Sequence, residues 1–206
     1  MLTIRAPEPL SSKASSNAWF VYLLALSDCS SFKVGFTCHP LQRISTFSRR
    51  YYERFDLSQS VLLQLETCED ARALEAAIKT ELGEFRADAP QWIPLEAGGQ
   101  TEWFSAVYFD QAERRLRAAA LDGTRLQGAR DYLGRELGAM RLCFEVWAWA
   151  QAQQTVAVRA AALRGYRVHD ARGCLRDWLD AYAYFDLPLF VDDPAVRSFV
   201  HESLGR

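Results

Sequence analysis

The segment from Arg49 to Arg54 interleaves basic side chains with tyrosines, a combination suited to contact with a nucleic acid. Arginines can bind phosphate groups, and tyrosine rings can stack on bases. We therefore take Arg49, Arg50 and Tyr51 as candidate nucleic-acid-binding residues. The alternative is a solvent-exposed helix end, where basic residues interact favourably with the helix dipole.

Cysteines and histidines, which supply nucleophiles and metal ligands in many sites, are scattered along this chain. The five cysteines occupy positions 29, 38, 68, 143 and 174, and no two of them are spaced as C-x-x-C. An odd number of cysteines in a chain of this size indicates reduced thiols, as expected of a cytoplasmic protein. The spacing of His39, His169 and His201 argues against a zinc cluster.

The composition is that of a folded protein without a general affinity for polyanions. Half of the 206 residues are hydrophobic and 13% are aromatic, which excludes a chain that is disordered throughout. Residues 1–105 carry 10 Lys+Arg against 13 Asp+Glu, and residues 106–206 carry 14, all arginine, against 13. The resulting net charge of −2 argues against non-specific coating of nucleic acid but leaves room for a local basic groove. No apolar stretch reaches the roughly 20 residues that span a bilayer, so we expect no membrane contact.

Hydrophobic patterning in the first half predicts a small unit of strands and helices. Two strongly apolar segments separated by a polar turn predict a hairpin, and Thr67 to Asp70 resembles a helix capping box. The expected elements are strands at 19–26, 32–37 and 60–65, helices beginning near residues 39 and 68, a loop at 87–100, and a short strand or helix entrance at 101–104.

The second half differs in composition and is predicted to be helical. Residues 106–165 are rich in Ala, Leu, Arg and Gln, which favours two or more helices with a break near 122–123. Residues 171–184 predict a further helix. Apolar residues cover most of the expected helix around Trp147, which indicates burial in a core or an interface.

These patterns predict an α+β fold in three parts. Residues 1–17, with two prolines and four serines, predict a flexible arm. Residues 18–106 predict a module with a three-stranded, mainly antiparallel sheet flanked by helices. Residues 107–206 predict an all-helical region of unknown role.

Five features of the module follow one another in a characteristic order. They are Val21-Tyr22, Lys33-Val34-Gly35, Arg43, Glu75 and Thr101-Glu102-Trp103-Phe104. This ordered set resembles the GIY-YIG nuclease superfamily over residues 18–106. The branch that it resembles most is found in phages and bacteria, where the second motif reads Lys-Ile-Gly and the module closes on Gly-Glu-Trp-Phe.

The resemblance implies an endonuclease that hydrolyses phosphodiester bonds in DNA. It implies that Tyr22, assisted by Lys33, positions or activates water, that Arg43 binds phosphate, and that Glu75 holds Mg²⁺ or Mn²⁺. One carboxylate with several waters suits Mg²⁺, and a guanidinium can form two parallel bonds to phosphate oxygens. Gly35 would let the backbone pass close to the site.

Two of these acidic residues have an ordinary structural alternative. Glu102 would either have a secondary role at the site or cap the following helix. Glu75 would either hold the metal or pair with Lys79, one helical turn away.

Two other functions remain open from the sequence. Phe20 replaces the first glycine of the family signature and Lys33 its second tyrosine, so the module could bind nucleic acid without cleaving it. The helical region could instead carry the specific function, as a homodimer interface or a site for a protein partner.

Overall fold

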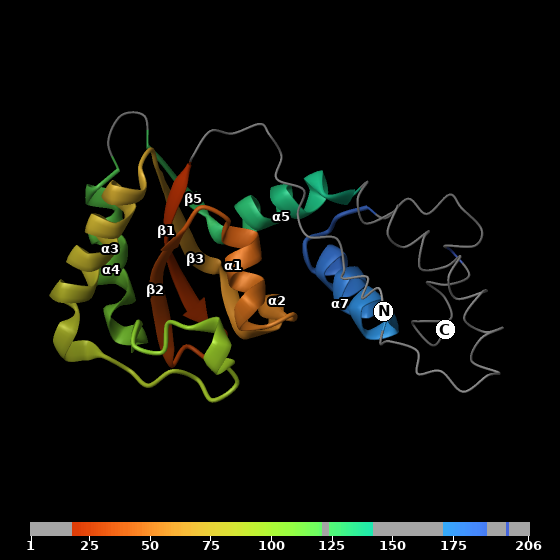
Figure 1. Ribbon diagram of the computed structural model, residues 1–206, viewed down its shortest axis with the longest axis horizontal. Helices are drawn as coiled ribbons and strands as arrows, with labels where there is room; N and C mark the ends of the chain where they lie inside the picture. The colour runs from red at the N-terminus through yellow and green to blue at the C-terminus, as the bar shows by residue number, and fades with distance from the viewer. Residues whose placement is uncertain (1–17, 121–123, 142–170, 189–196, 198–206) are drawn as a thin grey trace. The chain divides into compact units, whose positions relative to one another are not determined.

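The computed structural model describes residues 18–120, 124–141, 171–188 and 197, which belong to two compact units (Figure 1). The larger unit covers residues 12–135 and the smaller unit combines residues 1–11 with 136–206. The larger unit thus extends past the boundary at 106 that the sequence suggested. The expected arm at 1–17 and the apolar helix around Trp147 lie outside the described residues, as do His169 and His201.

The larger unit is built on an antiparallel sheet of five strands in the order β4-β2-β1-β3-β5. Its strands are β1 (Trp19–Leu26), β2 (Ser31–Thr37), β3 (Phe55–Leu65), β4 (Trp103–Ser105) and β5 (Arg125–Gly128). The α+β class is confirmed, and the expected three-stranded sheet is corrected to five strands. The two additional strands are the short outer ones.

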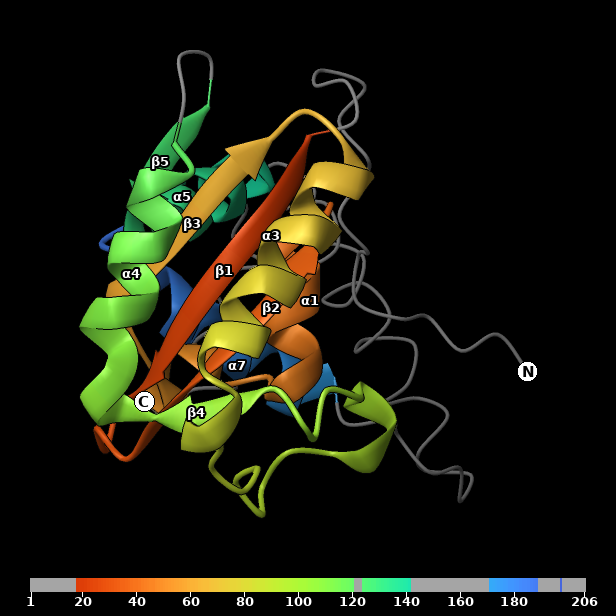
Figure 2. The ribbon, with the colours of Figure 1, turned by 90° about the vertical axis from the view of Figure 1, so that its left-hand side faces the viewer.

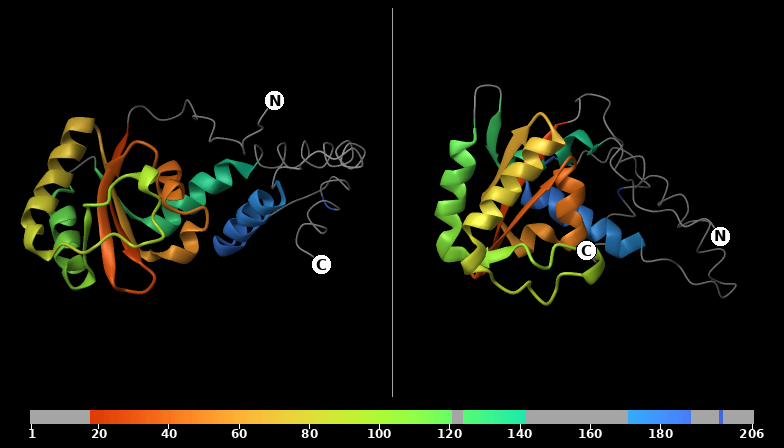
Figure 3. Two further views of the ribbon diagram at one scale, coloured as in Figure 1. Left: turned by 60° about the horizontal axis from the view of Figure 1, so that its bottom comes forward. Right: turned by 60° about the vertical axis from the view of Figure 1, so that its left-hand side comes forward.

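Helices cover both faces of this sheet. Helices α3 (Cys68–Glu81) and α4 (Phe109–Ala118) lie on one face, and α1 (Pro40–Phe47) and α2 (Tyr51–Arg54) lie on the other (Figures 2 and 3). Alternate residues of a strand point to opposite faces. In β1, Val21, Leu23 and Ala25 accordingly join the core beneath α3 and α4, while Tyr22 points the other way.

The local signals explain where the first helices begin. Pro40 occupies the start of α1, where its missing N–H costs no helical hydrogen bond. The Thr67 hydroxyl accepts a hydrogen bond from the Asp70 amide, which confirms the predicted cap of α3. Short 3-10 turns at Gly83–Phe85, Leu95–Ala97 and Ala106–Tyr108 punctuate the chain between α3 and α4.

Strand β3 begins five residues earlier than the sequence suggested. The polar residues at its start interrupt the apolar pattern by which a strand is predicted. In the structure, the Asp56 carboxylate accepts hydrogen bonds from the amides of Ser58 and Gln59. The Ser60 hydroxyl then accepts a bond from the Ala25 amide and donates to the Asp56 carbonyl. These contacts accompany a shift of register between β1 and β3.

Strand β5 lies inside the region expected to be wholly helical. Its residues Arg125 to Gly128 pair with Val61 to Gln64 of β3 and precede helix α5 (Ala129–Ala139). The four residues carry no alternating apolar pattern, so their extended conformation depends on the neighbouring strand. The other elements in the described part of the second half are helices.

The smaller unit contains helix α7 (Ala171–Tyr184), whose bounds match the helix expected there. Tyr182 is buried, and its hydroxyl donates a hydrogen bond to the Leu137 carbonyl at 3.0 Å. The predicted dimer or protein partner of the helical region stays a prediction.

The register of the β1–β2 hairpin sets a strict size limit at one position. Tyr22 lies opposite Gly35, and a Cβ atom at Gly35 would collide with the phenol oxygen and Cζ of Tyr22. The hairpin therefore places a tyrosine ring across a residue that has no side chain.

We expect Gly35→Ala to destabilise the protein by about 1–3 kcal/mol, because the Tyr22 ring must move out of a packed position. The free energy of unfolding in urea measures this change. Gly83→Ala is the matched control, since a Cβ atom at Gly83 meets nothing within 4 Å. Equal effects of the two substitutions would show that the contact with Tyr22 does not constrain position 35.

Candidate active site

Strand β2 is only partly covered by its outer neighbour. Strand β4 pairs with Ser31, Phe32 and Lys33, and the Glu102 carbonyl accepts one further hydrogen bond from the Val34 amide. Among the described residues, the rest of β2 from Gly35 has no strand on that side. The predicted site residues gather around this end of β4.

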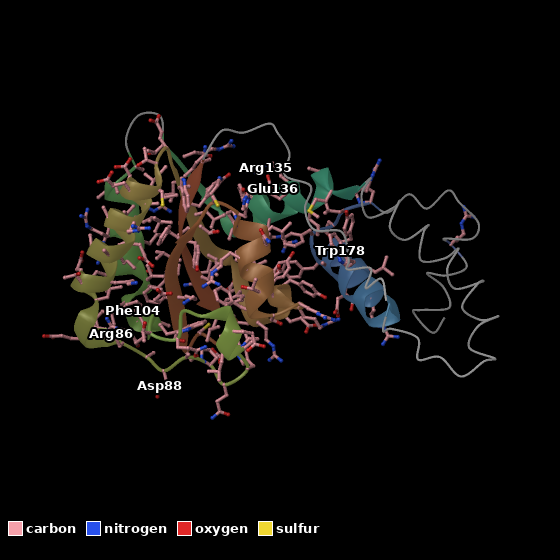
Figure 4. All side chains as sticks on the ribbon, in the orientation of Figure 1. Arg86, Asp88, Phe104, Arg135, Glu136 and Trp178 are labelled. Carbon is pink, nitrogen blue, oxygen red and sulfur yellow. The ribbon has the colours of Figure 1, made fainter. Side chains whose placement is uncertain are left out.

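The segment that leads into β4 is fastened on its other side by Arg86. This residue forms a single β-bridge with Phe104, which lies near it (Figure 4). The Arg86 guanidinium also donates to the Thr101 carbonyl at 2.9 Å. The Ala87 amide also donates to the Trp103 carbonyl. Residues 101–104 are therefore held between β2 and the chain that follows α3.

Tyr22 is almost completely buried over Gly35. Burial raises the pKa of its phenol to about 12, although the charge of Arg43 and a side-chain hydrogen bond with it act to lower it. The negative charges of Glu102 and Glu75 act in the same direction as burial. Tyr22 is thus a neutral phenol at physiological pH, and its neighbouring cation is Arg43.

Arg43 projects from α1, and its guanidinium is held by two contacts. Its Nη1 donates to the Ala97 carbonyl at 2.6 Å, and its guanidinium lies 4.6 Å from the centre of the Phe47 ring. A guanidinium has five N–H donors, so this anchoring leaves donors for an anion. Arg43 is half-buried beside the Tyr22 hydroxyl.

Lys33 lies in β2 with its side chain fully buried. Its ammonium donates to the Glu102 carboxylate at 2.9 Å and to the Gly99 carbonyl at 2.7 Å. Burial lowers the pKa of Lys33, and Glu102 opposes this effect. Gly99 has a φ of 73°, and a Cβ atom there would collide with the Lys33 ammonium, so both the backbone conformation and the space favour glycine at this position.

Glu75 and Glu102 are joined by a residue that the resemblance does not assign. The Lys79 ammonium lies 3.3 Å from Glu75 Oε1 and 3.2 Å from Glu102 Oε1. Glu75 and Lys79 are one helical turn apart on α3, the pairing that the sequence left as the alternative to a metal role. Burial lowers the pKa of Lys79, but its contacts with the two carboxylates raise it above the usual value, so the Lys79 ammonium stays charged.

The two carboxyl groups differ in their surroundings. Burial raises the pKa of Glu75, and the nearby charge of Glu102 adds to this, while Lys79 lowers it. Although burial acts against it, the pairing with Lys33 and Lys79 holds the pKa of Glu102 below its usual value. Glu102 is therefore the more firmly ionised of the two.

Glu75 offers a divalent ion one carboxylate ligand and is not part of a preformed set of protein ligands. The described residues contain no group of three Asp, Glu, His or Cys side chains that could hold a metal. Mg²⁺ is commonly bound by one or two carboxylates and keeps several waters, which one carboxylate at this position can satisfy. The Lys79 ammonium lies against that carboxylate.

The predicted nucleic-acid cluster is divided by the fold. Arg49 is exposed, while Arg50 forms a two-pronged ion pair with Glu53 at 2.6 and 2.9 Å. Tyr51 is only 4% exposed, so its ring is not on the surface where a base would stack. Its ring instead packs against Tyr52, and the nucleic-acid role of Tyr51 stays a prediction.

Other sequence expectations concern residues away from the cluster. His39 is exposed and precedes α1, and Cys29, Cys38 and Cys68 are free thiols. No helix within the described ranges is long and apolar enough to span a bilayer. Sequence reasoning named Lys79 only as an alternative partner of Glu75, and it missed Gly99 and the Ala97 carbonyl as parts of the site. The glycine pair at 98–99 was the one local signal for them, and it was interpreted as a loop.

Comparison with known families places this site in context. The sequence model of the T5orf172 domain matches residues 19–120. This domain is nuclease-associated, and the matched range includes Tyr22, Lys33, Arg43 and Glu75. No curated protein and no solved structure shows a significant match to the chain.

Because Tyr22 is buried, the stability of the protein should fall as the pH rises through the alkaline range. The pKa of Tyr22 is about 12 in the folded protein against 10 when exposed, so the unfolded chain loses the proton first. The stabilisation that the protonated Tyr22 gives the folded protein is fully present below pH 10 and is lost between pH 10 and 12. The free energy of unfolding falls by about 2–3 kcal/mol over this range. Unfolding in urea should show the difference between wild type and Tyr22→Phe shifting over this range, whereas a constant difference would contradict the assignment.

The enclosed Lys33 charge makes Glu102 important for stability. We expect Glu102→Gln to destabilise the protein by about 2–4 kcal/mol, because it leaves a buried ammonium without its counter-charge. Glu113→Gln removes a carboxylate that pairs with the exposed Arg117 and should cost less than about 1 kcal/mol. Urea unfolding measures the stability of both variants. Similar losses of stability would show that the burial of Lys33 is not the reason why Glu102 stabilises the protein.

Proposed function

We propose that residues 19–120 form the catalytic module of a metal-dependent endonuclease of the GIY-YIG type that hydrolyses phosphodiester bonds in DNA. The observation that carries the proposal is the convergence of Tyr22, Arg43 and Glu75. They come from β1, α1 and α3, and the pKa of Tyr22 responds both to the positive charge of Arg43, which lowers it, and to the negative charge of Glu75, which raises it. The nuclease-associated domain matched over the same residues supports it.

Arg43 is the residue proposed to bind the phosphate. Its attachment to the Ala97 carbonyl and the Phe47 ring fixes the direction of the guanidinium before substrate arrives. A planar guanidinium can donate two parallel hydrogen bonds to phosphate oxygens, which a lysine cannot do. Arg43 would therefore orient the phosphodiester and stabilise charge that develops on it.

Tyr22 is proposed to position the attacking water as a neutral phenol. With a pKa of about 12, its hydroxyl can donate or accept a hydrogen bond but is not a base at neutral pH. A divalent ion held by Glu75 would supply positive charge near the leaving-group oxygen. Acting as a base would require Tyr22 to gain more positive charge nearby than Arg43 provides.

Lys33 is proposed to position other groups rather than to touch the substrate. Its ammonium is fully enclosed, and its bonds run to Gly99 and Glu102. Through Glu102 it orients Lys79, which contacts Glu75. This role follows from burial and differs from direct assistance to Tyr22.

A second candidate is a module that binds DNA without cleaving it. The observation that favours it is the balance of charge: the two carboxylates of the site are already paired with the two lysines. In that case the protein would bind DNA through Arg43 and show no turnover with any divalent ion.

Cleavage assays on plasmid, single-stranded and branched DNA with Mg²⁺ and Mn²⁺ test the proposal. We expect wild type to cleave, and Glu75→Gln and Arg43→Lys each to lower the rate by about 10²-fold or more. Arg117→Gln, on the exposed face of α4, is the control for loss of a charge and should keep the wild-type rate. Cleavage by folded Glu75→Gln at the wild-type rate would refute the metal role, and DNA binding without cleavage would establish the second candidate.

A further inference from the structure

Lys79 is unusual in this chain because most of the basic residues are arginines. The chain contains 24 basic residues, and three of them, Lys13, Lys33 and Lys79, are lysines. The two lysines within the described ranges both contact Glu102. An ammonium is a compact charge on a flexible stem, whereas a guanidinium is a broad planar group.

The two lysines differ in their freedom to move. The Lys33 side chain is 0% exposed and fixed by two short hydrogen bonds. The Lys79 side chain is 26% exposed, and both of its carboxylate contacts are longer than 3 Å. Lys79 can therefore leave Glu75 by rotating its side chain, while Lys33 cannot leave Glu102 without opening the core.

The position that Lys79 occupies is the one that a cation on Glu75 needs. Oxygen ligands bind Mg²⁺ at about 2.1 Å, and the Lys79 ammonium lies 3.3 Å from Glu75 Oε1. Two like charges on one carboxylate repel each other strongly when the carboxylate is largely buried. A divalent ion bound to Glu75 would therefore weaken the ion pair with Lys79, and the ion pair would weaken binding of the ion.

We propose that Lys79 is an internal competitor for the divalent ion, and that the ion displaces its ammonium from Glu75. The proposal rests on the metal role of Glu75 proposed above. Lys79 then lowers the affinity of the site for metal and stabilises the protein before metal arrives. Glu102, its second partner, is placed to hold the displaced ammonium.

Metal binding to the full chain tests this directly. Titration calorimetry with Mn²⁺ should give Lys79→Met and Lys79→Gln a Kd about fivefold lower than wild type, because no ammonium has to be displaced. Lys79→Arg keeps the charge and should keep weak binding. Arg115→Gln removes one charge from neighbouring α4, where Arg115 pairs with Glu81, and should leave the Kd unchanged.

A spectroscopic measurement on wild type avoids any effect of substitution on folding. Lysine labelled at the side-chain terminus gives signals from three residues, and Lys79→Met identifies one of them. Addition of Mg²⁺ should shift the Lys79 signal and leave the Lys33 signal largely in place. A Lys79 signal that does not respond at saturating Mg²⁺ would overturn the displacement.

The outcomes separate this inference from the function on which it rests. If Glu75→Gln binds Mn²⁺ as tightly as wild type, the metal role of Glu75 is wrong and the competition fails with it. If Glu75→Gln loses binding but the Lys79 variants bind like wild type, the metal role stands and the competition is refuted. If Arg115→Gln tightens binding as much as Lys79→Met, general electrostatics replaces competition as the cause.

Discussion

The ammonium of Lys33 is enclosed within the protein, and its charge must be balanced there because water cannot do so. Glu102 supplies the counter-charge and the Gly99 carbonyl accepts a second hydrogen bond. The rings of Phe47 and Trp103 lie 5.4 and 5.3 Å from the same nitrogen and present their faces to the cation. One charge in β2 thereby ties α1, the loop after α3 and β4 into a single arrangement, and the other site residues are positioned within it.

The hairpin register imposes a second constraint on the same residues. Tyr22 and Lys33 project from the same face of the sheet, because Tyr22 lies opposite Gly35 and Gly35 is two residues from Lys33 on β2. Slippage by one residue would exchange the faces of a whole strand. The geometry of the site therefore depends on the same hydrogen bonds that hold the centre of the sheet together.

Elements with a strong local signal could be predicted from the sequence, whereas those made by distant contacts could not. The apolar run of β1, the Thr67 cap and the bounds of α7 follow from periodicity and capping chemistry. Strand β5 could not be foreseen, because its polar residues are extended only through pairing with β3. Similarly, the resemblance identified Tyr22 and Arg43, but the bond from Lys33 to Gly99 joins residues 66 positions apart and no spacing rule predicts it. Burial of Tyr51 depends on packing around α2 and was likewise not visible in the local pattern.

The order of strands gives β5 a significance beyond its four residues. It pairs with Val61 to Gln64, the most apolar part of the long strand β3, and so covers an edge that would otherwise be open. The T5orf172 match ends at residue 120, before this strand begins. A chain ending at that point would present the bare backbone of β3 to any other extended chain, which is how sheets join edge to edge and aggregate. The short polar strand after the matched domain thus covers the backbone of β3 along Val61 to Gln64.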